Sequence, residues 1–256
     1  MEIRILGAHS CETRATSCVS FLVDGTLAVE AGGLTSHLSL DEQRRLNAIV
    51  LTHEHLDHIR DIPCIALNLY RCGSEINVYS TARVCDTIRT HLLNGRVYPE
   101  FQKIPARKPT VNFALVEPLV AQRIDGHSIL PVPVNHCSAA VGYQITDGEG
   151  SSVFYTADTG PGLLECWRHV SPRLLLIDVT LPDDFERFAR KTGHLTPALL
   201  EKELLAFRDC RGYLPRVIVV HMDSSLEGRI REEIAAVSGR LGIPITVARE
   251  GMRVRV

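Results

Sequence analysis

The chain has 256 residues, of which 45% are hydrophobic and 23% charged, so it can bury a large core as one domain or as two fused layers. A formal net charge of −2 gives no global attraction to nucleic acid or to an anionic membrane, so nucleic-acid binding is unsupported, although a local basic patch stays open. No stretch has the length of a membrane span or of a signal peptide, and we expect a cytoplasmic protein without a membrane partner.

Strands dominate the first fifty residues. Asp24 and Gly25 favour a hairpin turn between the second and third of these strands. Ser39, with Glu42 three residues later, has the pattern of a capping box and predicts a short helix over 39–46. Alternating or unbroken apolar residues predict the strands at 1–6, 17–23, 27–30 and 48–51.

The next seventy residues have a regular pattern up to about residue 93 and an irregular one after it. Residues 62–72 have a helical pattern that ends at Gly73, a strand is predicted at 76–79, and a helix follows to about residue 93. From 94 to 120 the pattern is irregular, with prolines at positions 99, 105, 109 and 118. We expect this segment to be an irregular excursion over the surface.

The second half alternates apolar runs with helical patterns. Thr196 and Pro197 have the residue types of a helix cap and first turn, and they open one of the predicted helices. Eight cysteines occur without a C-x-x-C pair, which indicates small buried hydrophobes more than disulfides. Strands are predicted at 128–134, 152–156, 174–178 and 216–220, and helices at 163–170, 196–207 and 225–238.

One segment concentrates the chemistry: residues 52–58 read Thr-His-Glu-His-Leu-Asp-His and directly follow the apolar run 48–51. Such a loop at the end of a buried strand is a rigid support for ligands. His53 and His55 can point the same way and bind one ion, whereas Asp57 and His58 are adjacent and are easier to satisfy with a second ion. Imidazole and carboxylate ligands suit zinc, and also manganese or iron.

The run from His53 to His58 resembles the H-x-H-x-D-H signature of the metallo-β-lactamase superfamily. The resemblance implies an α/β fold, a four-layer αββα sandwich of two mixed β-sheets, formed by residues 1–256 as a single hydrolase domain. It also implies three later ligands at strand ends, for which His136, Asp158 and His221 are the candidates. By the resemblance, metal one is bound by His53, His55 and His136, metal two by Asp57, His58 and His221, and Asp158 bridges the two ions.

Each later candidate also has a simpler interpretation. His136 is open to reading as a hydrogen-bonded loop residue, Asp158 as a turn residue before a run of turn formers, and His221 as a cap for the helix that follows. The order of the set along the chain favours the ligand interpretation. The remaining histidines match no motif position and are predicted to be surface or core residues: His9, His37, His91, His127 and His169.

A second motif, Gly193-His194-Leu195-Thr196, resembles an element of the phosphodiesterase-like branch of the superfamily, which includes class II cyclic-nucleotide phosphodiesterases and tRNA 3′-processing nucleases. The resemblance makes His194 the proton donor to a leaving alkoxide. A histidine just before a helix cap can instead merely pack or hydrogen-bond.

The implied reaction is hydrolysis of a small-molecule phosphodiester, such as a cyclic nucleotide, by a hydroxide that bridges the two metals, with Asp57 orienting this nucleophile and His194 protonating the leaving oxygen. Alternatives are an ester, lactone or thioester hydrolase, a tRNA 3′-processing-type nuclease, and a non-catalytic binding or redox module. A β-lactamase role is disfavoured without an export signal. The oligomeric state stays open, with a homodimer as one alternative.

The chain departs from the family pattern in three places. Glu30 precedes the small residues where many relatives have an aspartate, so contacts behind the metal ligands are expected to differ. Arg60 follows the signature and can either bind a phosphate or pair with Asp61. A long glycine-rich basic arm, as used by tRNA-processing members, is missing from the sequence, which disfavours the tRNA interpretation.

Overall fold

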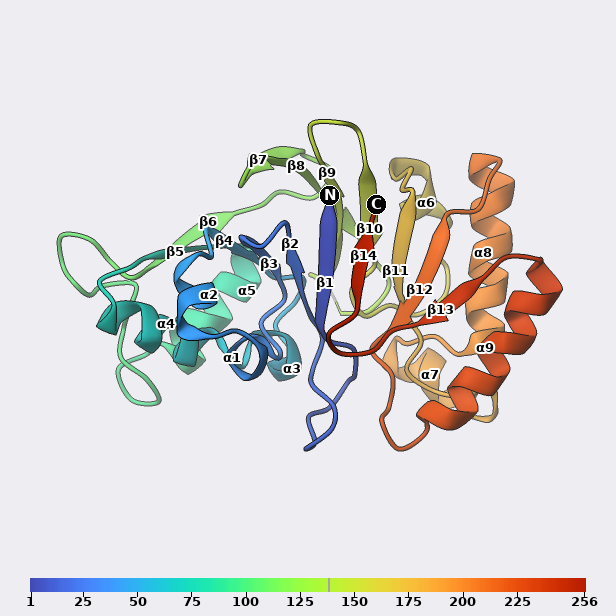
Figure 1. The fold of residues 1–256 in the computed structure, drawn as a ribbon, viewed down its shortest axis with the longest axis horizontal. Coiled ribbons are helices and arrows are strands. Elements are labelled where there is room, and N and C mark those ends of the chain that lie inside the picture. The colour runs from blue at the N-terminus through green and yellow to red at the C-terminus, as the bar shows by residue number, and fades with distance from the viewer. Residues whose placement is uncertain (138) are drawn as a thin grey trace.

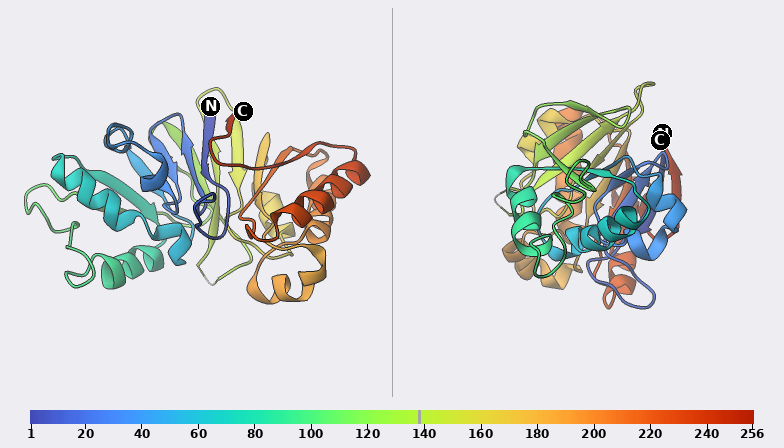
Figure 2. Two further views of the ribbon diagram at one scale, coloured as in Figure 1. Left: turned by 60° about the horizontal axis from the view of Figure 1, so that its bottom comes forward. Right: turned by 90° about the vertical axis from the view of Figure 1, so that its left-hand side faces the viewer.

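The structure is a computed structural model that describes residues 1–137 and 139–256. In these residues two seven-stranded β-sheets face each other and carry helices on their outer sides (Figure 1). Helices of the first half cover one sheet and helices of the second half cover the other, which gives four layers when the molecule is tilted forward (Figure 2). The predicted αββα sandwich is therefore confirmed.

The first sheet is mixed, with the strand order β14-β1-β2-β3-β4-β5-β6. β1 pairs antiparallel with β14 and β2, and β2 with β3, whereas β3 to β6 run parallel. The strands span Glu2–Gly7 (β1), Ser20–Val23 (β2), Leu27–Val29 (β3), Ala48–Val50 (β4), Ile76–Ser80 (β5), Val111–Leu115 (β6) and Arg253–Arg255 (β14).

The second sheet is also mixed and has the order β13-β12-β11-β10-β9-β8-β7. β10 to β13 run parallel, and β7 to β10 are joined as an antiparallel series. The strands span Gln122–Ile124 (β7), His127–Pro133 (β8), Val141–Thr146 (β9), Ser152–Tyr155 (β10), Leu174–Asp178 (β11), Arg216–Val220 (β12) and Ile245–Val247 (β13).

The helices lie on the outer faces of the two sheets, and two short turns complete them: the π-helical turn Ile88–Leu92, which continues α5, and the 3₁₀ turn Asp183–Phe185, which precedes α7. The helices are Leu34–His37 (α1), Leu40–Arg44 (α2), Leu56–Ile59 (α3), Ile62–Arg71 (α4), Ala82–Thr87 (α5), Leu164–His169 (α6), Glu186–Thr192 (α7), Pro197–Arg211 (α8) and Glu227–Leu241 (α9).

Burial on both faces of a strand explains the apolar runs of the sequence. All three residues of β4 are buried: Ala48 and Val50 belong to the large core that includes both sheets, whereas Ile49 packs into a second core with the first-half helices. Since neighbouring side chains of a strand point to opposite faces, β4 needs apolar residues at every position. A central strand of this kind holds the loop that follows it in a fixed place.

Local patterns in the sequence predicted several boundaries correctly. Asp24 and Gly25 have φ angles of 46° and 81° and join β2 to β3, as expected for a hairpin turn with two left-handed residues. Ser39 and Glu42 form the predicted capping box of α2. The Thr196 side chain accepts a hydrogen bond from the Leu199 backbone N–H and caps α8.

The prediction for 94–120 was only partly right. Residues 111–115 form β6, an edge strand that pairs parallel with β5, and the Phe101 side chain is buried in the core of the first-half helices. An edge strand exposes part of its surface, so its apolar pattern is weak, and nearby prolines hid it further. The short elements β7, β9, β13, β14 and α7 were also missed, because contacts with distant segments stabilise them more than local pattern does.

In the part of the chain that the structure describes, every helix is too short or too polar to cross a lipid bilayer. All eight cysteines are free thiols, and three of them, Cys18, Cys85 and Cys166, are buried as predicted for small hydrophobes. Three others, Cys11, Cys64 and Cys72, lie on the surface instead.

Glu203 of α8 holds the start of α6 against α8. Its side chain is 6% exposed, and its carboxylate accepts hydrogen bonds from the backbone N–H groups of Gly162 at 2.7 Å and Leu163 at 3.2 Å and from Trp167 Nε1 at 3.2 Å. Three donors therefore depend on one carboxylate, at the segment that follows the loop of Asp158.

Replacing Glu203 by alanine is expected to lower the free energy of unfolding by about 3 kcal/mol, because the buried donors lose their acceptor. Urea unfolding followed by tryptophan fluorescence measures this change, since Trp167 is the single tryptophan. Glu201→Ala is the matched control: Glu201 lies on the same helix as Glu203 and forms a surface ion pair with Arg240 of α9, so the midpoint should move far less. Equal shifts for both variants would contradict the role of Glu203.

Candidate metal centre

The seven predicted ligands come from four segments that meet at one end of the two sheets, on the side of α3 and α7 in Figure 1. Each loop follows a strand or opens the helix after it, so the rigid sheets hold the ligands from both sides. His53 and His55 follow β4, Asp57 and His58 lie in α3, His136 follows β8, Asp158 follows β10, and His221 follows β12.

The first group of ligands surrounds a point between His53, His55, His136 and Asp158. The Nδ1 atom of His55 lies 3.1 Å from His53 Nε2 and 3.1 Å from His136 Nε2. Asp158 Oδ2 lies 3.7 Å from His53 Nε2 and 3.8 Å from His136 Nε2. Three imidazole nitrogens and one carboxylate oxygen thus converge, and zinc is commonly bound by four ligands of these kinds.

The second group consists of Asp57, His58, Asp158 and His221. His58 Nε2 lies 3.3 Å from Asp57 Oδ2 and 3.3 Å from Asp158 Oδ1. His221 Nε2 lies 3.2 Å from Asp57 Oδ2 and 3.2 Å from Asp158 Oδ2. Asp158 belongs to both groups, so its carboxylate can bridge two cations.

Unsatisfied buried atoms show that this cluster fits metal ions. His58 Nε2 and Asp158 Oδ1 are buried and have no hydrogen-bond partner among the described residues. Buried polar atoms are rarely left without a partner, and a cation between these two atoms would satisfy both. The nitrogen and oxygen donors suit zinc, manganese or iron and do not distinguish among them.

The pKa values of the clustered groups also fit a metal site. Burial lowers the pKa of His53 well below its usual value and also lowers that of His136, so both rings are in the neutral form that binds metals. Burial alone would raise the pKa of Asp158, but His221 and His58 hold it well below its usual range. Burial would likewise lower the pKa of His58, but Asp158 and Glu30 raise it well above the ordinary value. A metal ion would take the place of the His58 proton.

Glu30 supports the ligands from behind and is fully buried. Its Oε1 lies 3.1 Å from His58 Nδ1, and it accepts a short hydrogen bond from the Thr52 hydroxyl. Thr52 Oγ1 is in turn 2.9 Å from His53 Nδ1. One carboxylate therefore lies beside a histidine of the second group and contacts a histidine of the first group through Thr52.

Two further histidines are oriented by contacts across the second sheet. His136 Nδ1 donates a hydrogen bond to the Gly193 carbonyl at 2.9 Å, and His221 Nδ1 lies 2.8 Å from Thr180 Oγ1. These contacts turn the Nε2 atoms of both rings toward Asp158. The alternative interpretations of His136 as a simple loop residue and of His221 as a helix cap have no support in this geometry.

Strained backbone is concentrated at the same place. Glu30, Ala157 and His221 have positive φ angles of 64°, 58° and 63°, although none of them is glycine. Such conformations cost about 1–3 kcal/mol each and persist where the surroundings enforce them. Each of these residues lies just after a strand, β3, β10 or β12, where the chain enters the cluster.

Asp178, at the end of β11, is a residue of this site that the sequence reasoning missed. It is fully buried, and its Oδ2 lies 2.7 Å from His194 Nδ1. It also accepts hydrogen bonds from the Thr180 hydroxyl at 2.7 Å and the Thr159 backbone N–H at 3.0 Å. An aspartate at the end of the apolar run 174–177 was the signal that could have found it.

The structure brings His194 next to the metal ligands. Its ring stacks on His221, with centroids 5.3 Å apart and planes 14° apart, and it also packs against His136. Burial alone would lower the pKa of His194, but the carboxylate of Asp178 raises the pKa to about 9. Because Asp178 binds Nδ1, the Nε2 atom carries the proton that can reach a substrate.

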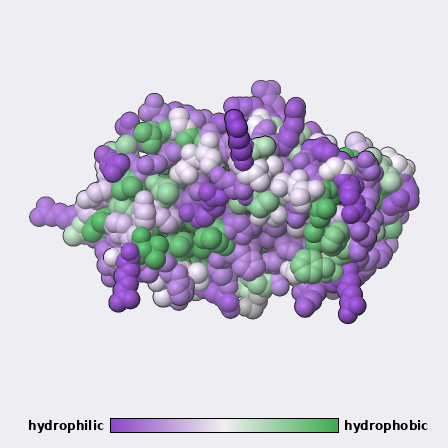
Figure 3. Space-filling model, turned by 90° about the horizontal axis from the view of Figure 1, so that it is seen from below, coloured by the Kyte–Doolittle hydropathy of each residue, from purple (hydrophilic) through white to green (hydrophobic). Residues whose placement is uncertain are grey.

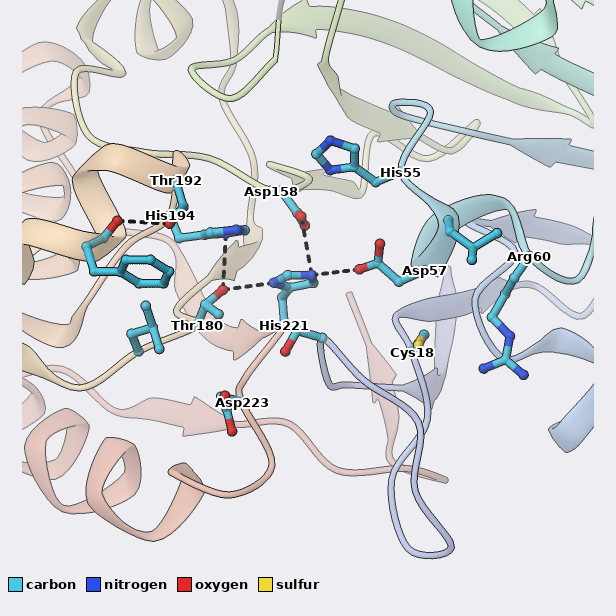
Figure 4. Close-up of a pocket in the computed structure, with 14 residues that line it drawn as sticks. Cys18, His55, Asp57, Arg60, Asp158, Thr180, Thr192, His194, His221 and Asp223 are labelled. Carbon is cyan, nitrogen blue, oxygen red and sulfur yellow. Dashed lines mark hydrogen bonds and ion pairs between the residues drawn. The ribbon is translucent and has the colours of Figure 1, made fainter. Parts of the chain in front are cut away.

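Four of the seven candidate ligands, His55, Asp57, Asp158 and His221, line a pocket of about 660 Å³, shown in Figure 4. Arg60 lies at its edge, and its guanidinium extends away from Asp158. It forms a close ion pair with Glu12 and lies 3.6 Å from Asp61 Oδ1, so the pairing alternative for Arg60 has direct support.

The face of the molecule seen from below carries hydrophobic surface in both halves with hydrophilic surface between them (Figure 3).

Gly193 offers a test of how His136 is positioned. A Cβ atom at Gly193 would lie 2.8 Å from His136 Nδ1, and the residue has a φ of 73°. Gly193→Ala is therefore expected to tilt the imidazole and to weaken the binding of one zinc ion by about 10- to 100-fold. Zinc titration with a competing chelator measures this affinity.

Gly212→Ala is the matched control, because Gly212 has a φ of 80° but nothing within 4 Å of an added Cβ. The Gly212→Ala variant has the same backbone strain as Gly193→Ala but no contact with His136. It should bind two zinc ions per chain as tightly as the unaltered protein. Tight binding of two ions by Gly193→Ala would show that the Gly193 carbonyl does not position the ligand.

Comparisons with known proteins agree with this geometry. A model of the beta-lactamase superfamily domain matches residues 21–222. A probable 3′,5′-cyclic-nucleotide phosphodiesterase of Yersinia pestis is 24% identical over 212 residues, which are 72% of this chain and 59% of that protein. A 3′,5′-cyclic-nucleotide phosphodiesterase of Schizosaccharomyces pombe is 32% identical over 104 residues, 40% of this chain and 28% of that protein. The chain thus matches little more than half of the first relative.

Solved structures share the fold at low identity. Unliganded yeast PDE1 superposes with a TM-score of 0.82 at 17% identity, covering 100% of this chain and 99% of that one. The short form of human tRNase Z superposes with a TM-score of 0.66 at 18% identity, with coverage of 100% and 99%. Because the domain model covers well over half of its residues, this chain belongs to the beta-lactamase superfamily.

Proposed function

We propose that the protein is a dinuclear metal-dependent phosphodiesterase that cleaves a cyclic nucleotide or another small phosphodiester. The observation that carries the proposal is the Asp178–His194 pair beside the two ligand groups, at 2.7 Å from Oδ2 to Nδ1. The similarity to the Yersinia and Schizosaccharomyces phosphodiesterases supports the same substrate class.

In this proposal each group of ligands holds one ion, and Asp158 is shared by both. The bound ions supply a water acidic enough to act as nucleophile near neutral pH and neutralise charge on a phosphate oxygen. Zinc is the proposed metal, with manganese or iron as alternatives. Metal one takes His53, His55 and His136, and metal two takes Asp57, His58 and His221.

Asp57 has a second task in this proposal. Its Oδ2 faces His58 and His221, and its side chain is 27% exposed to the pocket. Oδ1 is left to accept a hydrogen bond from the attacking water and so to orient it. Burial would raise the pKa of Asp57, but His221 and His58 hold it far below its usual range, so the carboxylate is ionised at neutral pH.

His194 serves as the proton donor to the leaving oxygen. With a pKa raised to about 9, it carries a proton at neutral pH, and bound cations would lower that value toward the range in which a proton is easily given up. Asp178 fixes the ring through Nδ1 and leaves Nε2 for the substrate. A proton donor matters most when the leaving group is an alkoxide, as it is in a cyclic nucleotide.

The pocket favours a small substrate over a tRNA. Its volume of about 660 Å³ is that of a site for a small molecule. Among the described lining residues, Arg60 is the one arginine or lysine, and it is paired with Glu12. Binding a polynucleotide backbone requires several cations near its phosphates. A thioester hydrolase would have little use for the Asp178–His194 pair, because a thiolate leaves without needing a proton.

Three further expectations remain predictions. We propose that residues 1–256 act as a single hydrolase domain, that the protein works in the cytoplasm, and that its partner is a small-molecule substrate. The oligomeric state stays open, with a homodimer as one alternative.

Substrate screening tests the proposed activity directly. With Zn²⁺ or Mn²⁺ supplied, we expect turnover of bis(p-nitrophenyl) phosphate and of adenosine 3′,5′-cyclic phosphate, and much slower turnover of thioesters, lactones and 3′-extended tRNA. Metal content measured on the same samples shows whether the site is loaded. A loaded protein that turns over none of the phosphodiesters would support the non-catalytic alternative and contradict the proposal.

His194→Ala separates proton donation from metal binding. We expect the rate for adenosine 3′,5′-cyclic phosphate to fall by about 10²- to 10⁴-fold, with two ions still bound, because a ribose alkoxide needs a proton. Bis(p-nitrophenyl) phosphate should lose much less, since p-nitrophenolate leaves as a stable anion. His169→Ala is the control, because His169 is an exposed histidine of α6 outside the pocket. Equal losses on both substrates would reject the assigned role.

A further inference from the structure

Helix α7 places an exposed aromatic side chain on the wall of the metal pocket. Phe188 is 54% exposed and lines the pocket together with Thr192, one helical turn later, and His194. The Thr192 hydroxyl donates to the Phe188 carbonyl at 3.0 Å, which ties the two residues together at the end of the helix. The wall formed by α7 therefore leads directly to the proton donor.

The proposed reaction indicates which part of the substrate lies along α7. If His194 protonates the leaving oxygen, as in the proposed function on which this step rests, the alcohol that leaves must lie on the His194 side of the phosphorus. In a cyclic nucleotide that alcohol is the ribose, which also bears the base. The base therefore extends along α7, where the Phe188 ring is exposed.

Apart from the candidate metal ligands, the lining of the pocket suits a flat ring better than a charged group. Leu181, 6% exposed, lines the same pocket, and Leu56 of α3, 64% exposed, adds apolar surface to it. Asp223 also lines the pocket and would repel a second phosphate, while Arg60 is paired with Glu12 and Asp61. An aromatic ring exposed beside a catalytic centre gains most from stacking on another planar ring.

We infer that Phe188 is a specificity-determining residue that stacks on the base of the leaving nucleoside, so that the site selects nucleoside cyclic phosphates over phosphodiesters whose leaving alcohol lacks a base. Stacking acts on the bound substrate and on the transition state alike. Loss of stacking is therefore expected to raise KM and to leave kcat little changed.

Two substrates with the same reacting phosphate test this role: adenosine 3′,5′-cyclic phosphate, and methyl riboside 3′,5′-cyclic phosphate, which lacks the base. For Phe188→Ala we expect kcat/KM on the adenosine substrate to fall about tenfold or more, mainly through KM, and to stay unchanged on the riboside. Phe188→Tyr keeps the ring and should retain the preference. Phe185→Ala removes a phenylalanine that is 37% exposed outside the pocket, and it should change neither substrate.

The outcomes distinguish this inference from the proposed function. One outcome is that the unaltered protein hydrolyses both substrates while Phe188→Ala lowers kcat/KM equally on both or on neither. That result would overturn the role of Phe188 but would leave the phosphodiesterase activity intact. No hydrolysis of either cyclic phosphate by the metal-loaded protein would overturn the proposed function together with the stacking role. Loss confined to the adenosine substrate supports both.

Discussion

The structure depends on the Asp158 carboxylate, which is buried among four imidazoles at 3.2–3.8 Å. A carboxylate in such a place is strongly destabilised unless positive charge lies beside it, and burial keeps two of the four rings, His53 and His136, in the neutral form. Bound cations would resolve the conflict, because the rings and the carboxylate could all donate lone pairs to them. Such cations would also supply the acidic water that the proposed reaction needs, so the electrostatic requirement and the proposed chemistry coincide.

The two sheets make this concentration of charge possible by holding it from opposite sides. Loops from the first sheet contribute the motif between His53 and His58, and loops from the second contribute the later ligands. Buried polar groups behind the rings, chiefly Glu30 and Asp178, orient nitrogens that would otherwise rotate freely. Part of the free energy gained in packing the apolar core is spent on positive φ angles at Glu30 and His221.

Sequence patterns were informative where local forces decide the structure. Unbroken apolar runs identified β4, β11 and β12, because strands that are buried on both faces need apolar residues throughout. Capping residues identified the start of α2 and α8. The edge strand β6 and helix α7 were not recognised, since half-exposed elements carry a weak pattern and owe their stability to segments far along the chain.

By itself the sequence predicted which side chains would bind metal and that they follow strands, because ligand type and the apolar run before it are local properties. Only the tertiary structure decided what stands behind and beside those ligands: Glu30 at His58, Asp178 at His194, the Gly193 carbonyl at His136, and Phe188 on the pocket wall. The physical reason is that these contacts join loops from different strands. Their distances are set by how two sheets pack, which no local pattern of residues encodes.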